Sequence, residues 1–115
     1  MLNKIMMTGR ITTDLNVVTE EDYSYCKFSI AVDQPKQKGV DTVKTDTFTC
    51  LAFDDNAKSV SFLYSKGGQI TFVSSLRKAP DNTVVIIVEE LHRTDLQSKL
   101  TLIRDSFFNG VGGML

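Results

Sequence analysis

Residues 45–64 read TDTFTCLAFDDNAKSVSFLY and change from a strand pattern to a helix pattern near Asp54. From Thr45 to Phe53 the side chains alternate in character, which predicts a strand with two different faces. The core face is predicted to carry Phe48, Cys50 and Ala52, and the other face carries Thr47, Thr49, Leu51 and Phe53.

A helix is predicted to follow this strand directly. The run Asp54-Asp55-Asn56 supplies side-chain oxygens that can cap the free N–H groups of a helix N-terminus. Gly67 and Gly68 can adopt the left-handed conformation that commonly ends a helix. Between these two signals, apolar side chains recur at helical spacing, at Ala57, Val60, Leu63 and Tyr64.

Four further segments have the pattern of strands: residues 3–11, 23–32, 69–77 and 83–92. Gly9 inside the first of them indicates a bulge or a sharp bend. Five strands with one helix between the third and the fourth are typical of the OB-fold, an all-β, five-stranded Greek-key barrel. Small sandwiches and other barrels share this element count, so the pattern predicts a fold class and no function.

The last residues differ from the rest of the chain. Leu96, Leu100, Ile103 and Phe107 fall on one face of a helix, although alternation at residues 100–102 leaves a strand as the alternative. We therefore expect residues 1–94 to form the OB-fold domain and residues 95–115 to form a short C-terminal helix or strand with a frayed end. The polar residues 33–44 are expected to form a long loop or flexible hairpin.

Composition limits the class of protein. The 115 residues are 42% hydrophobic and carry 13 Lys and Arg against 14 Asp and Glu, which fits one domain with its own core. No segment resembles a signal peptide or a membrane span, so we expect a soluble cytoplasmic protein that does not bind membranes. Because the net charge is −1, binding to a polyanion would require local segregation of the positive charge.

Few residues suit catalysis or metal binding. His92 stands alone, Asp54 and Asp55 fit a helix cap better than a metal site, and Glu89 and Glu90 are adjacent on a strand and point to opposite faces. We therefore expect no enzyme activity, metal or cofactor; a small nuclease would rest on His92 and the two aspartates alone. Cys26 and Cys50 are predicted to be buried, reduced thiols, and a disulfide between them would require neighbouring strands.

The basic residues and one aromatic residue suit single-stranded nucleic acid, which is held by a cationic groove and stacking platforms. Acidic residues cluster elsewhere, which would allow one positive groove, although a solvated surface of mixed charge is an equal alternative. Phe53 either stacks on a base or covers a barrel end, and Tyr23 and Tyr25 are weaker stacking candidates. The candidate cations are Lys36, Lys38 and Lys44 in the loop, Arg77 and Lys78 after the fourth strand, and Lys4 and Arg10 around the first.

Several of these segments together resemble bacterial and phage single-stranded DNA-binding proteins. The similar pieces are MLNKI at residues 1–5 with GRIT at 9–12, FSIAV at 28–32, DTFTCLAF at 46–53, and the helix end at Lys66-Gly67 with residues 69–76. The resemblance implies an OB-fold that forms dimers or tetramers and binds single-stranded DNA during replication, recombination and repair, without catalysis. The DNA contacts that it implies are Lys4, Arg10, Lys36, Lys38, Lys44, Thr47, Thr49, Phe53, Arg77 and Lys78.

The chain also departs from the family pattern. It has no tryptophan, Thr47 stands where an aromatic residue is usual, Val18 stands where an arginine is common, and the acidic, Phe-terminated tail tip is missing. We therefore expect binding that is weaker and more salt-sensitive than is usual in the family, and a phage or mobile-element origin, with the host cytoplasm as its location. An alternative is a tail-less OB-fold adaptor that binds a replisome protein or a recombination protein such as a recombinase.

Overall fold

The computed structural model describes residues 1–91 as six strands and one helix. The predicted C-terminal helix or strand, the domain boundary at residue 94 and His92 lie outside the described residues. No helix within residues 1–91 is both long enough and apolar enough to cross a membrane. The elements are β1 (Ile5–Ile11), β2 (Val17–Thr19), β3 (Ser24–Asp33), β4 (Thr45–Phe53), α1 (Asp54–Leu63), β5 (Gln69–Lys78) and β6 (Val84–Leu91).

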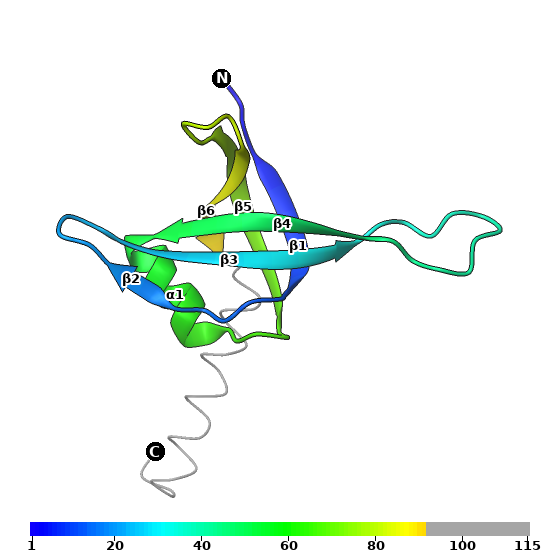
Figure 1. Cartoon of the computed structure of the whole chain (residues 1–115), viewed down its shortest axis with the longest axis horizontal. Coiled ribbons are helices and arrows are strands. Elements are labelled where there is room, and N and C mark those ends of the chain that lie inside the picture. Colours follow the sequence, from blue (N-terminus) through cyan, green and yellow to red (C-terminus); the bar gives the residue numbers. More distant parts are fainter. Residues whose placement is uncertain (92–115) are drawn as a thin grey trace, which may run out of the picture.

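The strands close into a barrel, as predicted (Figure 1). The sheet has the order β1-β5-β6-β4-β3-β2, and an additional pairing of β1 with β3 closes it into a barrel. Residues 5–10 of β1 pair with β5, whereas Arg10 and Ile11 pair with β3. The pairing of β4 with β6 is parallel and the other pairings are antiparallel. The five-stranded, all-β barrel with one helix between its third and fourth strands is therefore confirmed.

The short strand β2 was not predicted from the sequence. It pairs with the first residues of β3, with Val17 opposite Cys26 and Thr19 opposite Ser24, and adds an outer strand to the barrel. Three residues are too few to show alternation, so the pattern contains no signal for this strand.

The predicted core faces of β3 and β4 are the buried faces. Phe28 of β3 meets Phe72 of β5 edge to face, with 6.4 Å between the ring centroids, and both side chains are buried. Cys26 and Cys50 are free and buried on neighbouring strands, but they lie opposite Ala52 and Phe28 rather than opposite each other. Burial raises the pKa of Cys50 to about 12, so this thiol stays protonated at neutral pH.

The predicted side-chain cap of α1 is wrong. Phe53 occupies the N-cap position and makes no side-chain cap hydrogen bond. Asp54 has a positive φ of 51°, and its Oδ1 accepts a hydrogen bond from the Ser24 N–H at 3.1 Å. Asn56 donates from Nδ2 to the Glu89 carbonyl oxygen at 3.2 Å. These side chains therefore connect the start of α1 to β3 and β6, and do not cap the free N–H groups of the helix.

The end of α1 also comes earlier than the glycines suggest. Ala57, Val60 and Leu63 face the core, and Tyr64 terminates the helix with its N–H donating to the Val60 carbonyl at 3.1 Å. Gly67 has the expected positive φ of 89°, in the turn that leads to β5.

Gly9 marks a close approach and not a bulge. Pairing with β5 continues through Gly9, which lies opposite Ile70, and the register shift falls between Val73 and Ser74 of β5 against β6. A Cβ atom at Gly9 would lie 3.1 Å from the Ala31 carbonyl oxygen. The glycine therefore allows β1 to come close to β3 where the barrel closes.

Candidate nucleic-acid interface

One face of the β3–β4 pair points away from the core and runs along both strands. Three predicted contact residues of β4 lie on it, and the register places each beside a residue of β3. Toward the loop end, this face carries the short side chains of Ser29, Ala31, Thr47 and Thr49. The opposed pairs are Tyr25 with Phe53, Lys27 with Leu51, Ser29 with Thr49, and Ala31 with Thr47.

Aromatic rings gather at the α1 end of this face. The Tyr23 and Tyr25 rings stack with centroids 6.0 Å apart, and the Tyr23 and Phe53 centroids are 6.3 Å apart. Phe53 is 38% exposed and Tyr23 is 47% exposed. The structure therefore joins the weaker tyrosine candidates to Phe53 in one group, because Tyr25 lies directly across from Phe53.

Lys27 was missed as a candidate. It is exposed in the middle of β3, between the aromatic group and the short polar side chains around Ser29. Its position on the outer face follows from the same alternation that places Tyr25 there, so the signal is present in the sequence. An ammonium group at this point can contact a phosphate of a strand that lies along the face.

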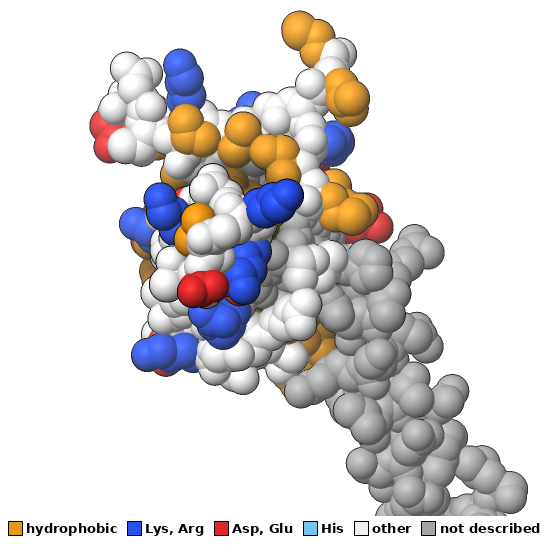
Figure 2. All heavy atoms as spheres, turned by 90° about the vertical axis from the view of Figure 1, so that its right-hand side faces the viewer, with side chains coloured by type: hydrophobic (Ala, Val, Ile, Leu, Met, Phe, Trp, Pro, Cys, Tyr) orange, Lys and Arg blue, Asp and Glu red, His pale blue; other side chains and the backbone are white. Residues whose placement is uncertain are grey.

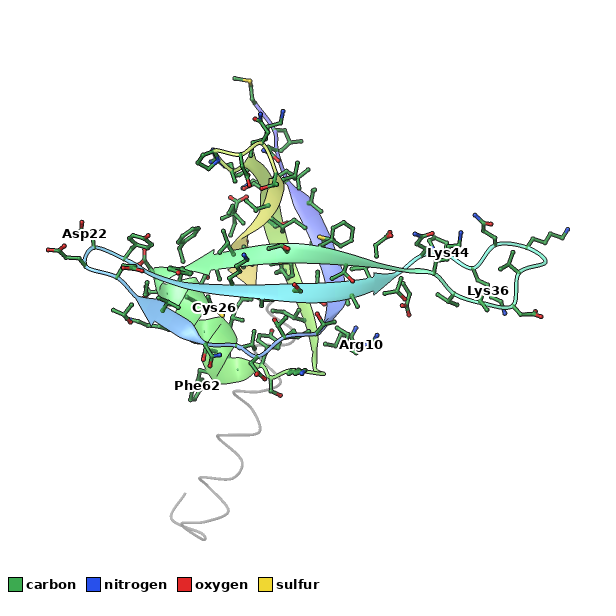
Figure 3. The ribbon with its side chains drawn as sticks, in the orientation of Figure 1. Arg10, Asp22, Cys26, Lys36, Lys44 and Phe62 are labelled. Carbon is green, nitrogen blue, oxygen red and sulfur yellow. The ribbon has the colours of Figure 1, made fainter. Side chains whose placement is uncertain are left out.

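The other end of the face carries the cationic loop, residues 34–44. Figure 2 looks onto this end of the molecule and shows Lys and Arg side chains gathered over it, with few acidic ones among them. Lys36, Lys38 and Lys44 are exposed, and Arg10 lies close to the root of the loop (Figure 3). Asp22 lies at the opposite end of the β3–β4 pair, whereas Asp33, Asp41 and Asp46 lie in or beside the cationic loop.

Hydrogen bonds hold the base of the cationic loop. The Gln34 N–H donates to the Lys44 carbonyl at 2.8 Å, and Thr45 Oγ1 donates to Asp33 Oδ1 at 2.8 Å. Gln34 Nε2 also donates to Asp46 Oδ1 at 2.9 Å. The lysines therefore project from a closed hairpin, as the polar composition of residues 33–44 suggested.

The remaining candidate cations form a separate group. Asn3 exchanges two hydrogen bonds with the Leu76 backbone, which places Lys4 close to Arg77 and Lys78 at the β5–β6 end of the barrel. Lys4 forms an ion pair with Glu89, and this hydrogen bond lowers the pKa of the Glu89 carboxyl. The ten candidates thus do not all meet in one groove: seven follow the β3–β4 face and the cationic loop, and Lys4, Arg77 and Lys78 do not.

The described residues contain no group of three or more His, Cys, Asp or Glu side chains that could hold a metal ion. Asp54 is engaged by the Ser24 backbone, and Glu89 by Lys4. Two of the residues considered for catalysis, Asp54 and Glu89, therefore have structural partners.

The sequence profile of the Single-strand binding protein family matches residues 2–85, which is most of the barrel. This chain belongs to the single-strand binding protein family. The residues that match include all of β1–β5 and α1 and the start of β6.

Individual relatives support the same assignment. A single-stranded DNA-binding protein of Staphylococcus epidermidis is 29% identical over 77 residues, which are 67% of this chain and 59% of the relative. One of Fusobacterium nucleatum is 32% identical over 72 residues, which are 60% of this chain and 47% of the relative. The chain thus spans about half of the length of these family members.

Solved structures in the family share the fold. The second single-stranded DNA-binding protein of Mycobacterium smegmatis has a TM-score of 0.65 at 18% identity, covering 78% of this chain and 86% of that one. The mitochondrial single-stranded DNA-binding protein Rim1 of S. cerevisiae has a TM-score of 0.63 at 20% identity, covering 78% and 91%. A phage origin for this chain stays a prediction.

Proposed function

We propose that this chain binds single-stranded DNA without requiring a defined sequence. The observation that carries the proposal is one continuous outer face on β3 and β4, with exposed rings at one end and the cationic loop at the other. Rings stack on any base and lysines contact any phosphate, so this arrangement suits a strand of arbitrary sequence. Both relatives are named single-stranded DNA-binding proteins.

Fluorescence polarisation tests the proposal directly. Labelled oligo-dT and a duplex of equal length are titrated with the protein at low and at moderate salt. We expect tighter binding to oligo-dT, because unpaired bases can reach the rings, and a steep fall in affinity with salt. Equal binding to both ligands, or binding to neither, would contradict the proposal.

We further propose that the chain protects single strands in the cytoplasm during replication, recombination and repair, without catalysis, as a dimer or tetramer. Within the described residues, β1 pairs with β3 only at Arg10 and Ile11, so residues 5–9 keep one edge open. Met6 on this edge is 68% exposed. Such an edge favours pairing with a second copy, and light scattering on the eluting protein measures the mass. A monomer at every concentration would contradict the assembly.

Replacing Phe53 by alanine tests the stacking contact. We expect Phe53→Ala to weaken oligo-dT binding by about 1–3 kcal/mol, the range found for loss of one base–aromatic contact. The loss should be clearest at high salt, where phosphate contacts contribute less. The matched control is Phe62→Ala, since Phe62 is 73% exposed on α1 and away from the face.

The same variant separates DNA binding from the adaptor alternative. If Phe53→Ala folds normally and binds oligo-dT unchanged, Phe53 does not belong to a DNA site, and a contact between Phe53 and a recombinase or replisome protein gains support. Circular dichroism of both phenylalanine variants shows whether the fold is retained.

A further inference from the structure

A hollow of about 260 Å³ lies where β1, β3 and β5 meet, next to the root of the cationic loop. Two small buried residues, Gly9 and Ala31, form its floor, where β1 packs closely on β3. The exposed residues around it all carry polar side chains: Thr8, Arg10, Asp33 and Gln69. The register brings them together, because Arg10 lies opposite both Gln69 of β5 and Ala31 of β3.

The hollow adjoins the proposed DNA face. Ala31, on its floor, lies opposite Thr47 of β4, which belongs to that face. A strand that runs from the aromatic group toward the cationic loop therefore passes its edge. No aromatic side chain lines the hollow, so a base that enters it meets hydrogen-bonding groups and no stacking partner.

Arg10 and Asp33 line the same hollow without pairing with each other. Within residues 1–91 the ion pair is that of Lys4 with Glu89, so the guanidinium and the carboxylate are available to a ligand. Thr45 Oγ1 donates to Asp33 Oδ1 at 2.8 Å, which orients the carboxylate and leaves its second oxygen as an acceptor.

Asp33 has a structural partner in Thr45, but its charge also acts on any ligand that enters the hollow. A carboxylate beside a phosphate repels it, so Asp33 would oppose binding if only the DNA backbone passed here. A carboxylate facing an amino group of a base is favourable, and Asp and Glu are known to accept from the N4 amino group of cytosine.

We propose that this hollow holds one nucleotide of the bound strand and prefers cytosine to uracil or thymine. Arg10 contacts the phosphate, and Asp33 accepts from the cytosine N4 amino group. The inference rests on the proposed single-stranded DNA binding and adds a modest base preference to it. Uracil and thymine present an oxygen at position 4. This oxygen would face the carboxylate oxygen of Asp33, and the two acceptors repel each other.

The test compares oligo-dC, oligo-dU and oligo-dT of equal length in slightly alkaline buffer, where cytosine is uncharged. Homopolymers place the same base at the hollow in every register, and uracil differs from cytosine at the ring edge without the thymine methyl group. We expect about fivefold tighter binding of oligo-dC than of oligo-dU. Cytosine gains one hydrogen bond to the carboxylate, whereas the uracil oxygen at the same position is repelled by it. Equal affinities for oligo-dC and oligo-dU would overturn the inference.

Asp33→Asn is the decisive variant. The carboxamide can present either its oxygen or its amino group, so we expect oligo-dU binding to strengthen and the preference to fall to about one. Asp46→Asn is the matched control, because it removes the same charge at the base of the same loop from a residue outside the hollow. It should strengthen binding of both oligonucleotides equally and keep the preference.

The outcomes separate the two proposals. If oligo-dT binds better than duplex but the preference for oligo-dC is absent, or is unchanged in Asp33→Asn, the hollow does not read a base and the general DNA-binding proposal stands. If none of the single strands binds, the proposed function itself fails.

Discussion

Replacing Lys36, Lys38 and Lys44 together by alanine is expected to weaken binding to oligo-dT by roughly thirtyfold at low salt. Three exposed charge contacts at about 0.7 kcal/mol each give about 2 kcal/mol in total. The slope of log affinity against log salt should also become shallower by about 2, because each phosphate contact on a single strand contributes about 0.7. Polarisation titrations at four salt concentrations measure both quantities.

A control variant removes charge elsewhere. Lys58 on α1 and Lys66 in the turn after it are exposed and lie outside the cationic loop. Lys58→Ala with Lys66→Ala should lower affinity only slightly and leave the salt slope nearly unchanged. If this pair costs as much per lysine as the loop triple, net charge and not the position of the loop determines binding. The loop would then lose its assigned role.

Phe72→Ala is expected to lower the free energy of unfolding by about 3–5 kcal/mol, the usual cost of removing a fully buried phenylalanine ring. Phe72 is fully buried and its ring meets Phe28 edge to face across the barrel. The cavity would open between β3 and β5, where the packed barrel has little room to collapse. Urea unfolding followed by circular dichroism measures the loss.

The matched control for this prediction is Phe62→Ala. It removes the same ring from a position that is 73% exposed, so we expect a change of at most about 0.5 kcal/mol. A large loss in this variant would mean that the ring is covered in the folded protein. A small loss in Phe72→Ala would mean that the core is packed differently from the structure described above.

Much of the barrel follows from alternation alone. Over most of β3 and the second half of β4, alternate side chains enter the core, so the pattern predicts both the buried Phe28 and Cys50 and the outer Thr47 and Phe53. The helix between β4 and β5 can also be predicted from the sequence, since Ala57, Val60 and Leu63 recur at helical spacing and are buried.

The sequence pattern does not show which group a side chain will contact in the folded protein. Asp54 fits a helix cap by its residue type, yet its carboxylate accepts from the Ser24 N–H, because β3 passes close to the start of α1. Gly9 suggests a bulge or a sharp bend; no bulge is present, and the glycine allows the approach of β1 to β3. Both outcomes depend on which segments meet in space, and local sequence carries no information on this.

The candidate site was predicted only in part, for a similar reason. Residue type identifies the lysines of the cationic loop and Phe53, whose positions follow from strand and loop patterns. The ion pair of Lys4 with Glu89 joins residues 85 positions apart in the sequence. Asp33 and Gln69 come to line one hollow with Arg10 only when the barrel closes. The positions of the basic residues along the sequence therefore predict local positive patches but not which charges remain available.

The pairing of β1 with β5 has a consequence for biosynthesis. Met6 lies opposite Val73, so β1, which is synthesised before the other strands of the barrel, has its main partner near the end of the barrel sequence. At about 5–20 residues per second, β1 waits for several seconds, while the β3–β4 hairpin can already form. During this interval the open β1 strand is the segment most exposed to mispairing, and a slow, late closing step is expected when the protein refolds in vitro.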